Sequence, residues 1–211
     1  MKILFLGDSI TEGIGASSKD KNYVNLVKDA LGCEVVNYGV SGTRIGRQER
    51  VYFYTLWNYD FRLRAQIMES EADKVFVFGG TNDYGHGALH LGKVNERIPE
   101  TFCAELRLLI EDLIEKYGKS KLCFLLPLRR HNDEQGIACK GENGDEPGEN
   151  LFEYKKAMEA ILVEYGIDFI DLYEKGIPKS RIDEYTVDGV HPNDKGYALI
   201  ANIICGYIKN K

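Results

Sequence analysis

The 211-residue sequence lacks several features that would assign a protein to a class directly. No apolar run approaches the roughly 18–20 residues needed to cross a bilayer. The opening MKILFL is too short for the apolar region of a signal peptide and runs directly into polar residues. Positive charge is not in excess, since the formal net charge is -6, which argues against nucleic acid or an anionic membrane as the main partner. We therefore expect a cytoplasmic protein with no membrane or nucleic-acid partner, unless a leader has been removed.

The sequence also lacks the cysteine patterns that hold small folds together. Its five cysteines are odd in number, widely spaced and without a C-x-x-C pair, which argues against a disulfide framework and a zinc site. Most lie in apolar segments and are expected to be small core residues. Cys139 lies in a polar loop and is assigned no function. The full set is Cys33, Cys103, Cys123, Cys139 and Cys205.

The composition is that of an ordinary globular domain, with 44% hydrophobic and 28% charged residues. At this length we expect one domain over residues 1–211. Five short apolar runs bounded by Gly, Pro or charged residues predict strands buried on both faces. They are Lys2–Leu6, Glu34–Tyr38, Lys74–Phe78, Lys121–Leu126 and Asp168–Leu172. Helical periodicity lies between them, at Tyr23–Leu31, from Pro99 to a stop at Gly118, at Leu151–Tyr165, and from a cap near Asn193 to Ile208.

Strands that alternate with helices predict a parallel sheet with helices on both faces, that is, three layers of α/β/α. For five strands we expect the flavodoxin-like order 2-1-3-4-5. Two segments do not fit the alternation. Gly46–Met68 is crowded with aromatics, and those at 52–61 are interpreted either as core or as an acyl or sugar platform. The polar segment Arg129–Asn150 is the longest candidate loop and could bind a ligand.

Polar, glycine-rich corners follow the first three predicted strands. In a sheet of this order, ligands bind beyond the carboxyl ends of the strands, where the strand order reverses. We therefore expect these corners to face one crevice, together with a polar turn that precedes the last helix. The four segments are Gly7-Asp8-Ser9, Asn37 to Thr43, Gly79 to Asp83, and Asp188 to Asn193.

These segments resemble the four sequence blocks of the GDSL, or SGNH, hydrolases. The matching residues occur in the family's order with similar spacing and span nearly the whole chain. Ile10 stands in place of leucine, which keeps an apolar side chain. The resemblance implies the SGNH hydrolase fold and a serine esterase or acylhydrolase that uses no metal or cofactor. The residues that carry it are Gly7-Asp8-Ser9-Ile10, Gly42, Gly80-Thr81-Asn82-Asp83 and Asp188-x-x-His191.

The chemistry of these residues agrees with the resemblance. Serine is a weak nucleophile until a base takes its proton, and the base needs an orienting partner. For Ser9 the candidate base is His191, and Asp188 lies three residues earlier, within reach of the imidazole. An oxyanion needs donors placed beforehand. The candidates are the Ser9 N–H, the Gly42 N–H and the Asn82 side-chain amide.

Other polar residues at the same corners are weaker candidates. Asp8, Thr43, Thr81 and Arg130 are expected to contact substrate, although Asp8 is also suited to capping a helix. Asp83 is interpreted as a turn residue. His86 and His90 are spaced four apart, but three glycines in Gly85–Gly92 and the lack of a third ligand favour loop or pocket-rim positions over a metal site.

We expect hydrolysis of small acyl esters, with acetyl on a sugar or similar polyol as the first hypothesis. A lysophospholipase or thioesterase is the alternative among enzymes, and transfer of the acyl group to an alcohol stays open. From another class, a flavodoxin-like module could bind phosphate or flavin at Gly7–Gly13. That stretch carries Asp8 and Glu12, which would repel phosphate, and no lysine or arginine. A hydrolase-like scaffold without activity is disfavoured because no expected catalytic residue is missing.

Overall fold

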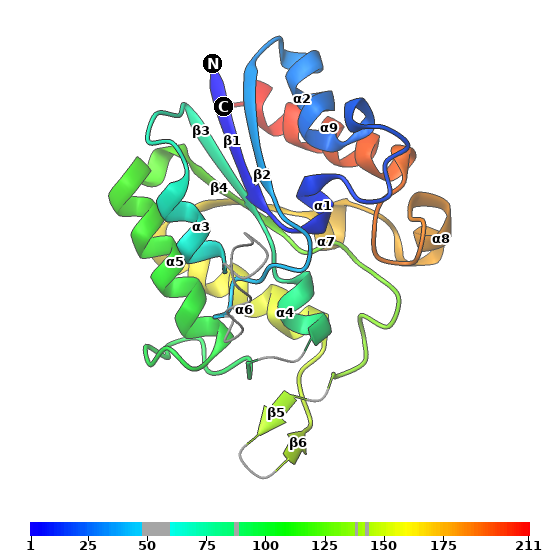
Figure 1. The fold of residues 1–211 in the computed structure, drawn as a ribbon. Coiled ribbons are helices and arrows are strands. Elements are labelled where there is room, and N and C mark those ends of the chain that lie inside the picture. The colour runs from blue at the N-terminus through cyan, green and yellow to red at the C-terminus, as the bar shows by residue number, and fades with distance from the viewer. Residues whose placement is uncertain (48–59, 87–88, 138, 142–143) are drawn as a thin grey trace.

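A sheet of five parallel strands forms the centre of the molecule (Figure 1). The structure is a computed structural model that describes residues 1–47, 60–86, 89–137, 139–141 and 144–211. The strand order is β2-β1-β3-β4-β7, and every neighbouring pair is parallel. The predicted order 2-1-3-4-5 is therefore confirmed. The strands are β1 (Lys2–Gly7), β2 (Glu34–Gly39), β3 (Lys74–Phe78), β4 (Leu122–Leu126) and β7 (Asp168–Asp171).

The predicted strand positions agree with the structure to within one residue at each end. The expectation of burial on both faces holds for the inner strands, since all of β4 and most of β1 and β3 are buried. It is wrong for the two edge strands, since β2 has no fully buried residue and β7 has one. Leu172 begins a short helix, α7 (Leu172–Lys175), instead of ending β7, because the Asp171 side chain caps that helix.

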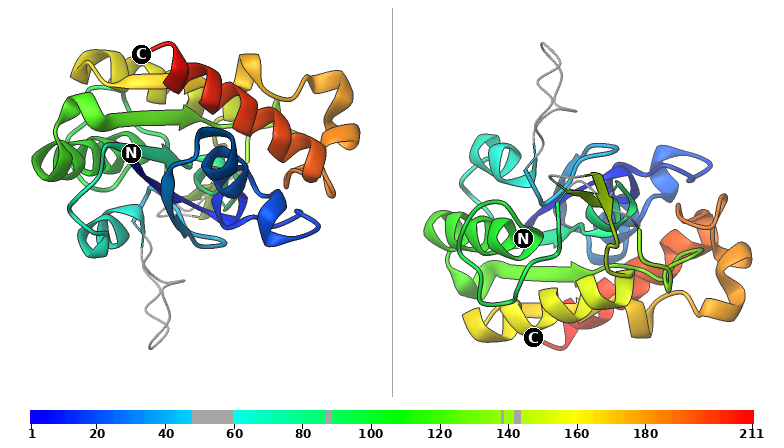
Figure 2. Two further views of the ribbon diagram at one scale, coloured as in Figure 1. Left: turned by 90° about the horizontal axis from the view of Figure 1, so that it is seen from above. Right: turned by 90° about the horizontal axis from the view of Figure 1, so that it is seen from below.

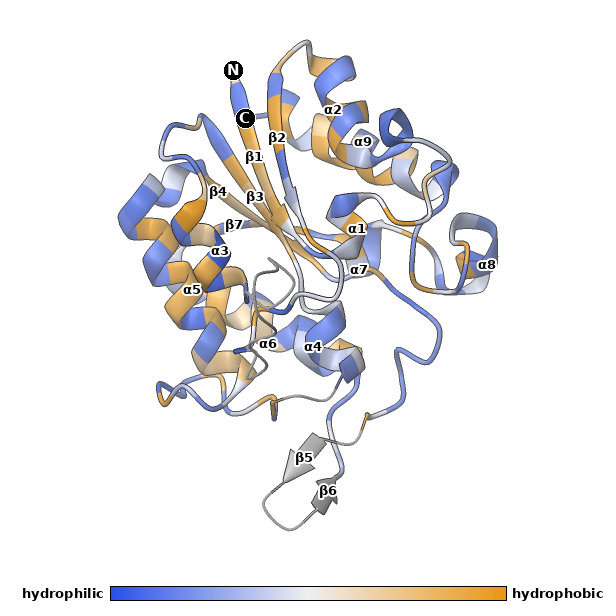
Figure 3. Cartoon of the chain, in the orientation of Figure 1, coloured by the Kyte–Doolittle hydropathy of each residue, from blue (hydrophilic) through white to orange (hydrophobic). Residues whose placement is uncertain are grey.

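Helices cover both faces of the sheet, as predicted (Figures 1 and 2). Successive side chains of β1 point to opposite faces, so that Leu4 and Leu6 join one core while Ile3 and Phe5 join the other. The first core packs against α3 (Phe61–Ile67), α4 (Thr81–His86), α5 (Phe102–Tyr117) and α6 (Leu151–Tyr165). The second packs against α1 (Ser9–Glu12), α2 (Tyr23–Leu31), α8 (Ile182–Tyr185) and α9 (Asp194–Lys209). Figure 3 shows apolar residues gathered on the strands and on the helix sides that face them.

Capping residues set the helix ends. Asn150 and Glu153 form a capping box at the start of α6, and Gly166 ends that helix in the left-handed conformation. Asn193 caps α9, as predicted. The predicted start of α5 at Pro99 is wrong, because the Thr101 hydroxyl caps the helix and Phe102 is its first residue.

The segment Arg129–Asn150 contains an antiparallel hairpin that the sequence analysis did not predict. It is formed by β5 (Cys139–Gly141) and β6 (Gly144–Glu146). Cys139 therefore lies in a strand, while the other four cysteines are buried and free. The predicted aromatic platform falls on residues 52–61, of which 52–59 lie outside the described residues, and Phe61 is buried in the core. Within the described ranges, no helix is long and apolar enough to span a membrane.

Two glycines let the first turn after β1 pack directly on the sheet. A Cβ at Gly7 would lie 1.8 Å from the Thr11 hydroxyl oxygen, and one at Gly39 would lie 2.1 Å from the Glu12 backbone nitrogen. Gly7 and Gly39 are also paired across β1 and β2. The contact between α1 and the strand ends therefore requires residues without side chains.

We expect Gly39→Ala to lower the free energy of unfolding by about 1–3 kcal/mol, because the added methyl would overlap backbone that cannot move aside independently. Gly206→Ala in α9 is the matched control. A Cβ there meets nothing within 4 Å, and alanine favours a helix by about 0.5–1 kcal/mol. Denaturant unfolding of both variants tests this, and equal stability of the two would contradict the packing described here.

Candidate active site

Ser9 is the first residue of a one-turn helix at the carboxyl end of β1. The turn forms because the Asp8 carboxylate caps it, accepting the Ile10 N–H at 3.0 Å. Gly13 ends it in the left-handed conformation, with φ of +108°, and donates its N–H to the Ser9 carbonyl. Ser9 is thereby held at the edge of the sheet and is 6% exposed.

The turn before α9 brings His191 and Asp188 to that serine. The Nε2 atom of His191 lies 3.0 Å from the Ser9 Oγ, and its Nδ1 atom lies 2.6 Å from an Asp188 carboxylate oxygen. The other Asp188 oxygen accepts the N–H groups of Val190 at 3.0 Å and of His191 at 2.7 Å. Residues from the two ends of the chain therefore form one continuous hydrogen-bonded line.

Hydrogen bonds determine the protonation state of Asp188 and the tautomer of His191. Partial burial of Asp188 favours its neutral form, but hydrogen bonds from the His191 ring and from the two N–H groups outweigh it and lower the pKa of the carboxyl. The ionised carboxylate only accepts, so it places the imidazole proton on Nδ1 of His191. The Nε2 atom then has a lone pair for the Ser9 hydroxyl proton, which is the arrangement that general-base activation requires.

Gly42 lies in a turn that other elements hold in place. Its φ of +75° is a left-handed conformation that glycine adopts readily, and it is exposed. The Glu12 carboxylate accepts both the backbone N–H of Ser41 at 2.7 Å and its hydroxyl at 2.5 Å. On the other side, Asn82 donates one amide N–H to the Thr43 carbonyl at 3.0 Å. Among the described residues none accepts the second N–H of Asn82, which could therefore be donated to a ligand.

A buried arginine that the sequence analysis missed supports the same corner. Arg64 in α3 is 3% exposed and donates to the Thr43 hydroxyl at 2.7 Å, to the Gly7 carbonyl at 3.0 Å and to the Tyr38 carbonyl. It thus joins the ends of β1 and β2 to the turn at Gly42. Burial lowers the pKa of its guanidinium to about 10, against the opposing effect of Asp8. The sequence signal was its place on the apolar face of α3, beside Phe61 and Ala65.

Asp83 is more than the turn residue that the sequence predicted. Its carboxylate accepts the N–H of Gly46 at 2.7 Å and of Ile45 at 3.1 Å, which fixes the chain that follows the Gly42 turn. Burial raises the pKa of Asp83 to about 6. Four side chains, of Glu12, Arg64, Asn82 and Asp83, therefore hold one short segment.

Asp8 and Thr43 were expected to contact substrate, and the structure places both side chains in the interior. Each is 1% exposed, and both side chains bond to protein groups. They lie beneath the site as supports. Thr81 is 6% exposed, and its hydroxyl accepts a hydrogen bond from Arg130. Arg130 is half-buried at the same end of the sheet.

The structure places His86 and His90, which are four apart in the sequence, in different local structures. His86 is the last residue of α4, and His90 forms a bridge with Thr101 before α5. Burial, with Arg44 and Arg130 nearby, lowers the pKa of His86. In the part of the chain that the structure describes, no three His, Cys, Asp or Glu side chains gather as metal ligands.

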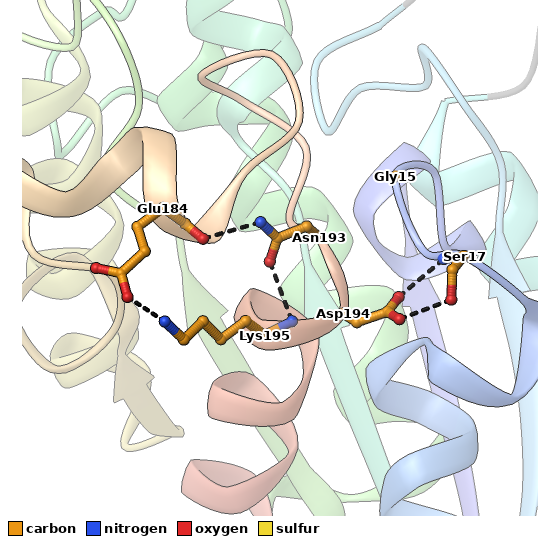
Figure 4. A pocket seen from close by; sticks show the side chains of 6 residues that line it. All are labelled: Gly15, Ser17, Glu184, Asn193, Asp194 and Lys195. Carbon is orange, nitrogen blue, oxygen red and sulfur yellow. Dashed lines mark hydrogen bonds and ion pairs between the residues drawn. The ribbon is translucent and has the colours of Figure 1, made fainter.

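A surface hollow lies next to the turn that carries His191, and Figure 4 shows the residues that line it. Asp194 accepts both the N–H and the hydroxyl of Ser17, at 2.8 and 2.6 Å, while Glu184 binds Lys195. A Cβ on Gly15, whose φ is +95°, would lie 2.5 Å from the Pro192 carbonyl. Polar groups of this hollow are paired with one another, and these pairs help to hold the turn that carries His191.

Burial of Asp8 makes stability depend on pH. Burial, aided by the Asp83 charge, raises the pKa of Asp8 to about 7, although the Ile10 N–H and Arg64 oppose this. The folded state therefore holds a proton that the unfolded state releases near pH 4, so stability falls as pH rises from about 4 to about 7. Asp8→Asn cannot ionise and keeps the capping oxygen.

We expect Asp8→Asn to gain about 1–4 kcal/mol of unfolding free energy relative to the wild type between pH 4 and pH 8. Denaturant unfolding at several pH values measures this difference. Asp29→Asn, at an exposed position of α2, is the control and should give a constant difference. A constant difference for Asp8→Asn would show that Asp8 is ionised throughout.

Comparison with known proteins places this geometry in context. A model of the GDSL-like lipase/acylhydrolase family matches residues 5–199. A solved structure from Lactobacillus plantarum is 25% identical, with 99% of this chain and 96% of that chain covered and a TM-score of 0.80. A lipolytic G-D-S-L family protein from Veillonella parvula is 19% identical, with both chains covered fully and a TM-score of 0.70. An acetyl xylan esterase is 20% identical over 99% of this chain and 100% of that chain, with a TM-score of 0.67. The last two show the shared fold. Comparison with curated proteins gave no match.

Proposed function

This chain belongs to the GDSL-like lipase/acylhydrolase family, and from that membership we propose that it is a serine-dependent carboxylic ester hydrolase acting on small acyl esters. One observation carries the proposal, namely the unbroken hydrogen-bonded line from Asp188 through His191 to Ser9. Its distances fit a nucleophile, a base and an orienting carboxylate.

In the proposed reaction, the Ser9 Oγ bonds to the ester carbonyl carbon while its proton passes to Nε2 of His191. The carbonyl oxygen becomes an oxyanion, which the N–H groups of Ser9 and Gly42 and the Asn82 amide stabilise. The bond to the alcohol oxygen then breaks, and His191 gives its proton to that oxygen. Water, deprotonated by His191, attacks the acyl-enzyme and releases the carboxylic acid and Ser9. The proposal needs no metal or cofactor.

We propose acetyl as the acyl group, on a sugar or similar polyol. The corners around Ser9 are polar and glycine-rich, which favours a hydrophilic alcohol over a lipid chain. The fold shared with an acetyl xylan esterase is consistent with this choice. Long-chain preference in an ester panel would instead favour the lysophospholipase or thioesterase alternative, and ester products formed with an added alcohol would favour acyl transfer.

We expect Ser9→Ala to lower kcat for p-nitrophenyl acetate by about 10⁴–10⁶-fold, because no other group can form the acyl-enzyme. Wild-type protein should prefer acetyl over longer acyl homologues. Ser18→Ala is the matched control, since Ser18 is exposed and its hydroxyl caps no helix. Undiminished turnover by Ser9→Ala would remove Ser9 as the nucleophile and with it this proposal.

Asn82→Ala should lower kcat by about 10²–10³-fold with a much smaller change in KM, because an oxyanion forms only after attack. Steady-state kinetics with p-nitrophenyl acetate separates the two constants. Asn82→Asp is the companion variant, since it keeps the size of the side chain but places an acceptor where a donor is needed. A rise in KM at constant kcat would assign Asn82 to substrate binding instead.

A further inference from the structure

Arg130 is a half-buried cation for which the described residues supply no acidic partner. It follows β4 by four residues, and its Nη1 atom donates to the Thr81 carbonyl at 3.3 Å and to the Thr81 hydroxyl at 3.1 Å. No described carboxylate lies within ion-pair distance of its guanidinium. Its Nε atom is buried without a hydrogen-bond partner. Most of the five N–H donors of this side chain are therefore unused by the described protein.

Two other buried arginines have hydrogen-bond partners for more of their guanidinium N–H groups. Arg107 is 1% exposed and forms a two-pronged pair with Glu164. Arg64 is 3% exposed and donates to three oxygens. A buried charge without such compensation carries an energetic penalty, which a ligand of opposite charge would offset.

The Arg130 guanidinium is also held firmly. It lies over the Tyr84 ring, with 5.5 Å between its central carbon and the ring centroid. A Cβ at Gly85 would come within 2.9 Å of the Nη1 atom, so the absence of a side chain there makes room for the arginine. Contacts along one short helix, α4, thus fix a charge that would otherwise be mobile, and such fixation lowers the entropic cost of binding.

The surroundings of Arg130 place it at the catalytic end of the sheet. Thr81, to which it donates, is the neighbour of Asn82 in α4. Asp188, Asp8 and Asp133 act on the Arg130 charge through space, and Arg130 in turn acts on His86 together with Arg44. Arg130 therefore supplies positive charge beside α4, the helix that carries the Asn82 amide.

We propose that Arg130 binds a carboxylate of the substrate beside the reacting ester, so that this enzyme acts on small acyl esters of carboxylate-bearing compounds. The inference rests on the proposed esterase function. A guanidinium matches a carboxylate in charge and shape. A singly charged group is favoured over a phosphate, because a doubly charged ligand would face Asp188 with one fixed guanidinium to offset it.

The carboxylate could belong to the alcohol part or to the acid part of the ester, and two substrate pairs separate these sources. On the alcohol side, 4-acetoxybenzoate is compared with 4-acetoxybenzamide. On the acid side, monophenyl glutarate is compared with its terminal amide. Within each pair, the ratio of kcat/KM for the charged ester to that for the neutral ester is compared between wild type and Arg130→Gln, because the intrinsic reactivities of the two esters cancel in that comparison.

We expect the wild type to prefer the charged ester in one pair, and Arg130→Gln to lower that ratio by about 10–100-fold, mainly through KM. Arg130→Lys, which keeps the charge, should retain part of the preference. Arg97→Gln is the control, since Arg97 is exposed and paired with Glu111 away from the catalytic turn. No charged-ester preference in either pair, or an equal loss for both members of a pair in Arg130→Gln, would overturn the inference.

A binding measurement keeps this test separate from the test of esterase activity. Calorimetry with Ser9→Ala compares 4-hydroxybenzoate and glutarate, the charged products, with and without Arg130→Gln. We expect affinity for one of them to fall about 10–100-fold with the second substitution and to weaken as salt is added. If neutral esters are hydrolysed but the carboxylate affects neither rate nor binding, the inference about Arg130 is wrong while the proposed esterase function stands. No hydrolysis of any ester would remove the proposed function, while the binding result would still decide the role of Arg130.

Discussion

The alignment of three strand ends at one edge of the sheet is the constraint on which the rest of the site depends. Gly7, the last residue of β1, is paired with Gly39 of β2 and with Phe78 of β3. Because the strands are parallel and the order reverses at β1, the segments that follow leave toward opposite faces and open a crevice between them. The proposed nucleophile Ser9 and the oxyanion candidates Gly42 and Asn82 come directly after these three strand ends. A change of register at β1 would therefore separate the serine from its donors.

The two halves of the site are held by different means. The turn from Thr186 to Pro192 is held partly by its own hydrogen bonds, since Thr186 binds the Gly189 N–H and Val187 pairs with His191, and partly by the adjoining contact of Asp194 with Ser17. The turn at Gly42 is supported from outside by side chains of α1, α3 and α4. An oxyanion site needs donors whose positions are fixed before charge develops. Support from three separate elements provides this fixation, at the cost of burying charged groups close to one another.

The strand order could be predicted from the sequence, and the candidate catalytic residues could be identified in it, because both are recorded in short local patterns. Apolar runs mark the strands, and Ser9, Asp188 and His191 stand in short motifs at strand or helix ends. Supports such as Arg64 could not be assigned in this way, because their partners are backbone carbonyls that lie 26 and 57 residues away in the sequence. The burial of Asp8 and Thr43 was missed for the same reason. Exposure is set by neighbours that a linear pattern does not contain.

Charge around the crevice is distributed so that its two sides differ. Asp188 keeps its negative charge beside His191, where an imidazolium would form during attack. On the other side, Arg130 lies against α4, which carries the Asn82 amide that would receive the oxyanion. In the proposed reaction, negative charge therefore develops on the side of Arg130 and away from Asp188. The same asymmetry would orient a substrate that carries its own carboxylate, because Arg130 would attract that group while Asp188 would repel it.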